Sequence, residues 1–107
     1  MADPIIAYAK LPGHRWWKRC IGNDLQQLQT FVRGGIETCT LLPGLVVICN
    51  RDALLRDDFP ENCTVLGVTF HGPILLVGAE EDEFVSVSDD DIRERLPDAW
   101  LEISGGG

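Results

Sequence analysis

The stretch 34-GGIETCTLLPGLVVICN-50 decides the fold of this chain. It holds two β-prone runs, Ile36–Leu41 and Leu45–Asn50, and the Pro43-Gly44 dipeptide between them is typical of a tight turn. The stretch therefore predicts a β-hairpin. With the turn centred on that dipeptide, antiparallel pairing places Cys39 near Cys49.

The flanking segments supply what such a hairpin needs to bury its apolar face. Asn23, with Gln26 three residues on, forms a capping-box pattern that predicts a helix over Asp24–Arg33, ended by the glycines that follow. Ser88 before three aspartates predicts a second, short helix over Asp91–Leu96. Further strands are expected over Pro4–Lys10, Arg15–Ile21, Thr64–Phe70 and Pro73–Ala79.

These elements predict an α+β fold: a small mixed or antiparallel sheet of about five strands, with one three-turn helix on a face and a short C-terminal helix. The length of 107 residues favours a single domain over residues 1–103, followed by a flexible Gly-rich tail at 104–107. The run Ile74–Val77 is apolar at every position. It indicates a central strand covered on both faces, or covered on one face by another subunit.

The charge is unevenly distributed. The net charge is −8, yet residues 1–33 carry five Lys or Arg against two acids, and residues 34–107 carry four Arg against fifteen acids. Overall acidity argues against direct nucleic-acid binding, because phosphate contacts need clustered cations. No apolar run reaches membrane-spanning length and no secretion signal is evident, so we expect a cytoplasmic protein without a membrane partner.

Four cysteines stand at wide, irregular spacings without a CxxC pair. This pattern favours buried, reduced thiols over a metal centre or redox pair. No phosphate loop, nucleophile elbow or metal box is present either. The sequence therefore predicts no enzyme activity, no catalytic residue, no metal and no cofactor.

The sharpest local feature is 14-HRWWKR-19. Successive strand residues point to opposite faces, so Trp16 and Trp17 cannot both enter one core. If Trp17 faces outward, Arg15 and Arg19 flank it and form a cationic aromatic platform for an acidic protein patch or a nucleotide. The alternative is an outer tryptophan buried under the C-terminal segment or in a homodimer interface.

Three further residues are candidate contacts for a partner or ligand. Asn50 and Arg51 follow directly on a strand, and Asn62 follows a proline turn. Amides at strand ends can bind a ligand, but asparagine in turns more often bonds its own backbone.

The chain resembles an uncharacterised bacterial family, a domain of unknown function whose members are common on phages, plasmids and conjugative elements. The resemblance covers roughly residues 15–95 and rests on LQQLQTFVRGGIE at 25–37, VVICN at 46–50 and the later Val77-Gly78. It implies mobile-element cargo in a bacterial host cell and no catalytic motif. The doubled tryptophan and the cations of Lys10–Arg19 depart from the usual family pattern.

These observations predict a non-enzymatic binding protein of phage or mobile-element origin. We expect it to engage a host or defence protein, as an anti-defence type inhibitor, and to form a homo-oligomer. The alternative is a protein that sequesters a nucleotide-like small ligand at a subunit boundary.

Overall fold

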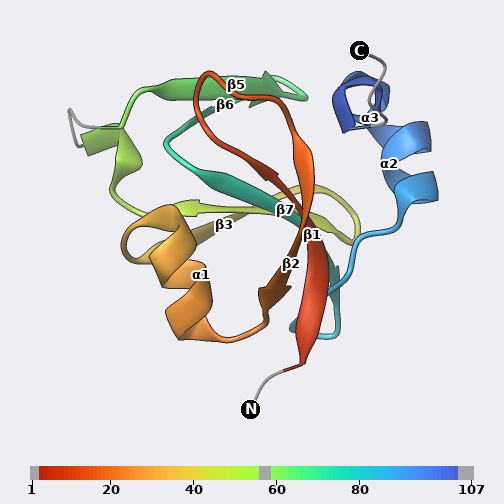
Figure 1. The fold of residues 1–107 in the computed structure, drawn as a ribbon, viewed down its shortest axis with the longest axis horizontal. Helices are drawn as coiled ribbons and strands as arrows, with labels where there is room; N and C mark the ends of the chain where they lie inside the picture. The colour runs from red at the N-terminus through yellow and green to blue at the C-terminus, as the bar shows by residue number, and fades with distance from the viewer. Residues whose placement is uncertain (1–2, 56–58, 104–107) are drawn as a thin grey trace.

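The computed structural model describes residues 3–55 and 59–103 (Figure 1), so the tail predicted at 104–107 lies outside the described residues. The elements, in chain order, are β1 (Pro4–Lys10), β2 (Trp17–Gly22), α1 (Leu25–Val32), β3 (Ile36–Leu42), β4 (Leu45–Asn50), the 3₁₀ turn η1 (Ala53–Leu55), β5 (Glu61–Val65), β6 (Val68–His71), β7 (Ile74–Glu80), β8 (Glu83–Val85), α2 (Asp89–Arg95) and α3 (Pro97–Ile103).

Six strands form one antiparallel sheet in the order β2-β1-β7-β4-β3, with β8 also paired to β7. Strands β5 and β6 form a separate two-stranded sheet. The α+β fold with an antiparallel sheet is thus confirmed. Strands β2 and β3 are the two ends of the main sheet.

The middle strand, β7, is buried along Ile74–Gly78. Its neighbours on the two edges are β4 on one side and β1 and β8 on the other. Both faces are covered by the chain itself: α1 lies on one, and the β5–β6 hairpin with α2 and α3 lies on the other (Figure 1). The apolar run therefore needs no second subunit.

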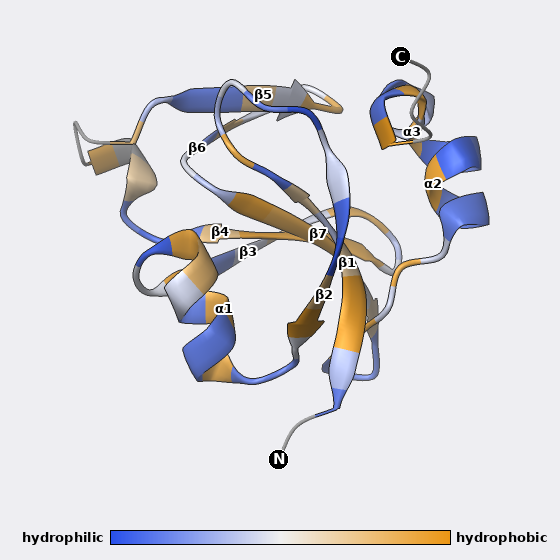
Figure 2. Cartoon of the chain, in the orientation of Figure 1, coloured by the Kyte–Doolittle hydropathy of each residue, from blue (hydrophilic) through white to orange (hydrophobic). Residues whose placement is uncertain are grey.

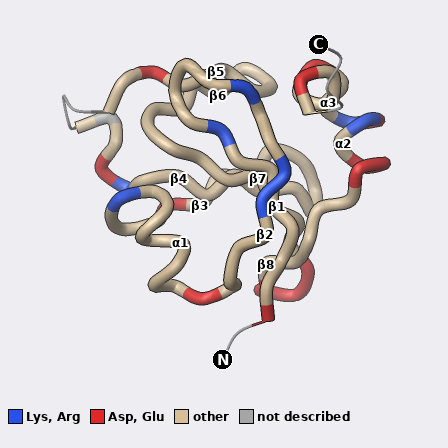
Figure 3. Tube along the Cα trace, viewed as in Figure 1, with Lys and Arg blue, Asp and Glu red and all other residues tan. Residues whose placement is uncertain are grey.

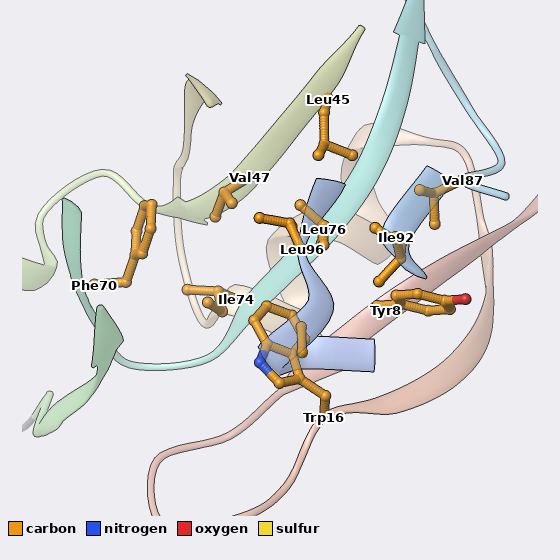
Figure 4. Packing of buried hydrophobic residues seen from close by; sticks show 11 residues of the cluster. Tyr8, Trp16, Leu45, Val47, Phe70, Ile74, Leu76, Val87, Ile92 and Leu96 are labelled. Atoms are coloured by element: carbon orange, nitrogen blue, oxygen red, sulfur yellow. The ribbon is translucent and has the colours of Figure 1, made fainter. Parts of the chain in front are cut away.

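Each face of the sheet has its own hydrophobic cluster, and apolar residues line the strands on both sides (Figure 2). Under α1, Leu28 and Val32 pack on Ile48 and Val77. Under the C-terminal helices, the cluster gathers residues of β1, β4, β7, α2 and α3 (Figure 4), including Tyr8, Trp16, Leu76, Ile92 and Leu96. The fold therefore has three layers.

The central hairpin is present, but its predicted register is wrong. Cys39 pairs with Val47, and Cys49 pairs with Glu37. One residue of this difference comes from the turn: a two-residue turn at Pro43-Gly44 pairs Leu42 with Leu45, which alone would place Cys39 opposite Ile48. The other comes from a bulge between Thr40 and Leu42, which inserts one extra residue on β3 and moves the partner of Cys39 to Val47.

Two predicted element boundaries also change. Asp24, and not Asn23, caps α1: its Oδ1 accepts a hydrogen bond from the Gln27 amide at 2.9 Å. Asn23 instead donates to the Phe84 carbonyl at 2.9 Å. The predicted strand 64–70 is interrupted, because Leu66 and Gly67 form the turn between β5 and β6.

The C-terminal helix signal is confirmed. The Ser88 side chain caps α2 by accepting from the Asp91 amide at 3.1 Å, so the helix starts two residues before the predicted boundary. Asp89, the first residue of α2, also connects this helix to the sheet. It accepts a hydrogen bond from the Tyr8 hydroxyl and pairs with Lys18 at 2.7 Å.

Candidate partner-binding site

Strand β2 pairs with β1 alone, so its outer edge is open in the described part of the chain. Basic side chains follow this edge. Arg15 lies just before the strand and Lys18 and Arg19 lie in it, and all three are exposed. Figure 3 shows basic positions where β1 and β2 run together, with acids at the β8 turn and on α2. We call Arg15, Lys18 and Arg19 the cationic edge.

Only one of these three charges is neutralised. Lys18 forms the ion pair with Asp89. Arg19 stacks over the Phe31 ring, with its guanidinium carbon 5.3 Å from the ring centroid. Within residues 3–55 and 59–103, neither Arg15 nor Arg19 forms an ion pair. Two guanidinium groups are therefore free to meet an anionic surface.

The two tryptophans do point to opposite faces, but both are covered by their own chain. Trp16 is 5% exposed and lies in the cluster under α2 and α3 (Figure 4). Trp17 is half-buried on the α1 side, with its ring centroid 6.3 Å from that of Phe31. Trp16 thus lies under the C-terminal segment, which is one of the two alternatives stated for the outer tryptophan, and neither indole requires a homodimer interface for its cover. The homo-oligomer stays a prediction without that support.

Asn50 and Arg51 lie far from the cationic edge, because β1 and β7 separate β4 from β2. Asn50 is 5% exposed, its Nδ2 donates to the Val32 carbonyl at 3.0 Å, and its Oδ1 accepts from the Asp52 amide at 2.8 Å. A Cβ on Gly34 would stand 2.8 Å from that Nδ2. Asn50 thus joins the end of α1 to the end of β4.

Arg51 is exposed, and its amide donates to the Gly35 carbonyl at 2.8 Å. It lies beside Asn50 in sequence and not at the cationic edge. The sequence reasoning grouped these two residues with Arg15 and Arg19, but the sheet order keeps the two groups apart.

Asn62 ties β5 to the rest of the chain. Its Nδ2 donates to the Lys10 carbonyl at 2.9 Å and to the Gly72 carbonyl at 2.7 Å. Its Oδ1 is buried and has no hydrogen-bond partner among the described residues. Asn62 therefore holds the hairpin over the end of β1, next to a hollow that the sequence reasoning missed.

That hollow lies between the β5–β6 hairpin and α2–α3 and has a volume of about 180 Å³. We call it the hairpin–helix pocket. Its lining residues are Lys10, Trp16, Cys63, Thr64, Val65, Leu66, Arg95, Leu96, Pro97, Asp98, Ala99 and Glu102. Trp16, a predicted site residue, thus forms part of its wall. No local motif marks the pocket, because its walls come from segments that are distant in sequence.

The Leu66-Gly67 turn stands at the rim of this pocket. Both residues have positive φ, at 49° and 83°, as a two-residue type I′ hairpin turn requires. A leucine in this region costs about 1 kcal/mol relative to glycine. The turn holds the Leu66 side chain at the pocket with 54% of its surface exposed. Gly67 is a turn residue that can be recognised in the sequence, but nothing in the sequence indicates that Leu66 before it also adopts a positive φ.

The thiols do not meet the expectation of burial. Cys20 is exposed, and Cys39, Cys49 and Cys63 are half-buried and reduced. Burial raises the pKa of the Cys49 thiol to about 11, with smaller contributions from Glu37 and Cys39. Burial also raises the pKa of Cys63; Lys10 opposes that shift and Glu102 adds to it. Both thiols are therefore protonated at neutral pH and are weak nucleophiles.

A family model, Domain of unknown function (DUF3846), matches residues 10–100. The chain belongs to the DUF3846 family. No curated protein and no solved structure matches this DUF3846 chain. The match covers the cationic edge and all of the hairpin–helix pocket except Glu102.

None of the described helices combines the length and apolar character needed to cross a bilayer.

Proposed function

We propose that this DUF3846 protein is a non-enzymatic binding protein that engages an acidic surface of another protein through its cationic edge. The observation that carries the proposal is the pair Arg15 and Arg19, which lie on an open strand edge and form no ion pair with any residue that the structure describes. In a chain of net charge −8, an unneutralised basic strand offers complementary charge to an acidic partner.

The open edge adds a second means of contact. An end strand presents unpaired N–H and C=O groups that can pair with an extended segment of a partner. Two copies of the cationic edge repel each other, so charge disfavours self-association through β2 and favours a different, acidic chain. A homo-oligomer, which we also propose, would use another surface.

The biological setting comes from the sequence resemblance. We place the protein on a phage, plasmid or conjugative element, acting in the cytoplasm of a bacterial host against a host or defence protein. The protonated thiols of Cys49 and Cys63 support a role without covalent catalysis.

The alternative, sequestration of a nucleotide-like ligand, has less support. Both polar atoms of the Asn50 side-chain amide form hydrogen bonds within the chain. The Phe31 ring already contacts both Trp17 and Arg19, which occupies part of the aromatic platform. A thermal shift on saturation with nucleotides would favour the alternative, because ligand binding raises the melting temperature by mass action.

The test compares proteins captured from a bacterial lysate by the immobilised wild type and by the double variant Arg15→Glu, Arg19→Glu. We expect the variant to lose the captured partner at low salt, and the wild type to lose it progressively as salt rises, because exposed charges are screened. The matched control, Arg51→Glu with Arg93→Glu, makes the same change in net charge away from the cationic edge. Equal capture by the wild type and the β2 variant, or equal loss in both variants, would contradict the proposal.

A further inference from the structure

The hairpin–helix pocket borders a further open strand edge, that of β5. Strand β5 pairs with β6 alone among the described residues. Four consecutive residues, 63–66, line the pocket. Neighbouring side chains of a strand point to opposite faces. A hollow that touches consecutive residues of a strand therefore lies beside the edge of that strand and not over one of its faces. The pocket therefore lies where a further extended segment can pair with β5.

The pocket also holds two opposite charges that do not pair with each other. Lys10 is 8% exposed, and its Nζ donates one hydrogen bond, to the His14 carbonyl at 2.6 Å. Within the part of the chain that the structure describes, Lys10 forms no ion pair. An ammonium has three donors, so a buried lysine with one acceptor keeps donor capacity for a ligand.

The carboxylate of the pair is Glu102. Its Oε1 accepts from the Trp16 amide at 3.3 Å, and its other oxygen has no hydrogen-bond partner among the described residues. The remaining charges of the lining are Arg95 and Asp98, and Arg95 is held by Asp91 and by the Pro43 carbonyl. A site with one free donor and one free acceptor fits a neutral group that has both, which is the pattern of a peptide amide.

The size of the pocket limits its occupant. Small-molecule sites usually have about 300–1,000 Å³. The volume of about 180 Å³ is smaller and suits a single large side chain. Trp16, Leu96 and Ala99 form the walls of the pocket around it. Such pockets accept the buried anchor residues of protein partners.

We propose that the hairpin–helix pocket binds an extended peptide segment that adds to the β5 edge, places one large apolar side chain in the hollow, and bonds its main chain to Lys10 and Glu102. The exposed side chain of Leu66 closes over the anchor at the rim. This inference rests on the proposed function only in that the ligand is part of a protein. The site is distinct from the cationic edge.

The probe is N-acetyl-phenylalanine N-methylamide, titrated into the full chain and followed by amide chemical shifts. We expect saturable shifts at residues 63–66 and 99, with a dissociation constant on the order of millimolar for a ligand of this size. The matched probe, N-acetyl-glycine N-methylamide, has the same amides without the side chain. It should bind at least about tenfold more weakly, because the apolar anchor is missing.

Lys10→Met keeps the aliphatic stem and removes the donor. We expect it to weaken binding of the phenylalanine probe about tenfold, since a hydrogen bond to a charged group is lost. The matched control is Arg51→Met, which removes an exposed cation outside the pocket and should leave the affinity within about twofold. Absence of saturable shifts at 63–66, equal binding of the two probes, or equal affinity of the Lys10→Met and Arg51→Met variants would overturn the proposal.

Leu66→Asn separates a binding defect from a folding defect. Asparagine tolerates positive φ, so we expect the melting temperature to rise by about 4 °C or more while the affinity for the phenylalanine probe falls. A variant that is stabilised and binds the probe as tightly as the wild type would overturn the role of Leu66 at the rim.

The two proposals fail separately. The probe titration contains no partner protein, so its failure overturns the pocket and leaves the cationic edge untouched. Loss of capture in Arg15→Glu with Arg19→Glu bears on the edge alone.

Discussion

At the scale of single residues, three side chains join three elements. Asp89, at the first position of α2, accepts hydrogen bonds from Lys18 of β2 and from Tyr8 of β1. These donors, Lys18 first, hold the pKa of the Asp89 carboxyl below its usual range. Burial, with the Asp89 contact, raises the pKa of Tyr8, so its hydroxyl stays a donor at every physiological pH. The contacts of Asp89 with Tyr8 and Lys18 hold α2 against the sheet and thereby shape one wall of the pocket.

The first prediction concerns pH. A carboxyl whose pKa is lower in the folded chain stabilises the fold above its unfolded pKa of about 3.9, and that contribution is lost as pH falls below it. Asp89→Asn should therefore lower the free energy of unfolding by roughly 1 kcal/mol at pH 7, a modest value because the side chain is 43% exposed and water screens the pair. The difference from wild type should shrink toward pH 3. Urea unfolding at both pH values measures it.

Glu94→Gln is the control, since Glu94 is exposed on the same helix. It should leave the free energy of unfolding nearly unchanged at both pH values. A defect in Asp89→Asn that is as large at pH 3 as at pH 7 would show that the loss is not electrostatic.

At the scale of elements, local signals predicted α1, α2 and most strands, because capping and β-propensity act within a few residues, whereas α3 was not predicted as a helix. The α1 cap was assigned one residue too early: Asn23 and Asp24 are both good caps, and the long-range bond from Asn23 to Phe84 decides between them. The hairpin register was missed because the turn pairs Leu42 with Leu45 and because the bulge at β3, which leaves no local trace, shifts the pairing by one residue more. The pocket was missed because packing between the hairpin and α3 creates it.

The second prediction concerns the α1 cap. Asp24→Ala removes the acceptor for the Gln27 amide and should cost about 1 kcal/mol in the free energy of unfolding. The measurement is urea unfolding at neutral pH. Asp24→Asn, which keeps a capping oxygen, should recover most of the loss. If both substitutions cost the same, the cap bond is not the source of the effect.

At the scale of the whole molecule, the three-layer arrangement removes the tryptophan pair as an argument for oligomerisation, and the homo-oligomer stays a proposal. A sheet covered on both faces by one chain can house neighbouring tryptophans on opposite sides, with Trp16 under α3 and Trp17 beside α1. Among the described residues the chain leaves several strand edges unpaired, and two of them carry the proposals: the basic edge at β2 and the edge of β5 at the pocket. Uneven charge in the sequence indicated the first edge, and nothing local indicated the second.

The most direct test of the central claim is site-specific photo-crosslinking in bacterial cells, with benzoylphenylalanine in place of Arg15 or, as control, Arg51, which is exposed and lies far from β2. We predict that position 15 yields a discrete heavier species containing a second, different protein, and that position 51 does not. A crosslink from neither position, from position 51 alone, or from position 15 only to another copy of this chain would contradict the claim that the cationic edge engages an acidic partner.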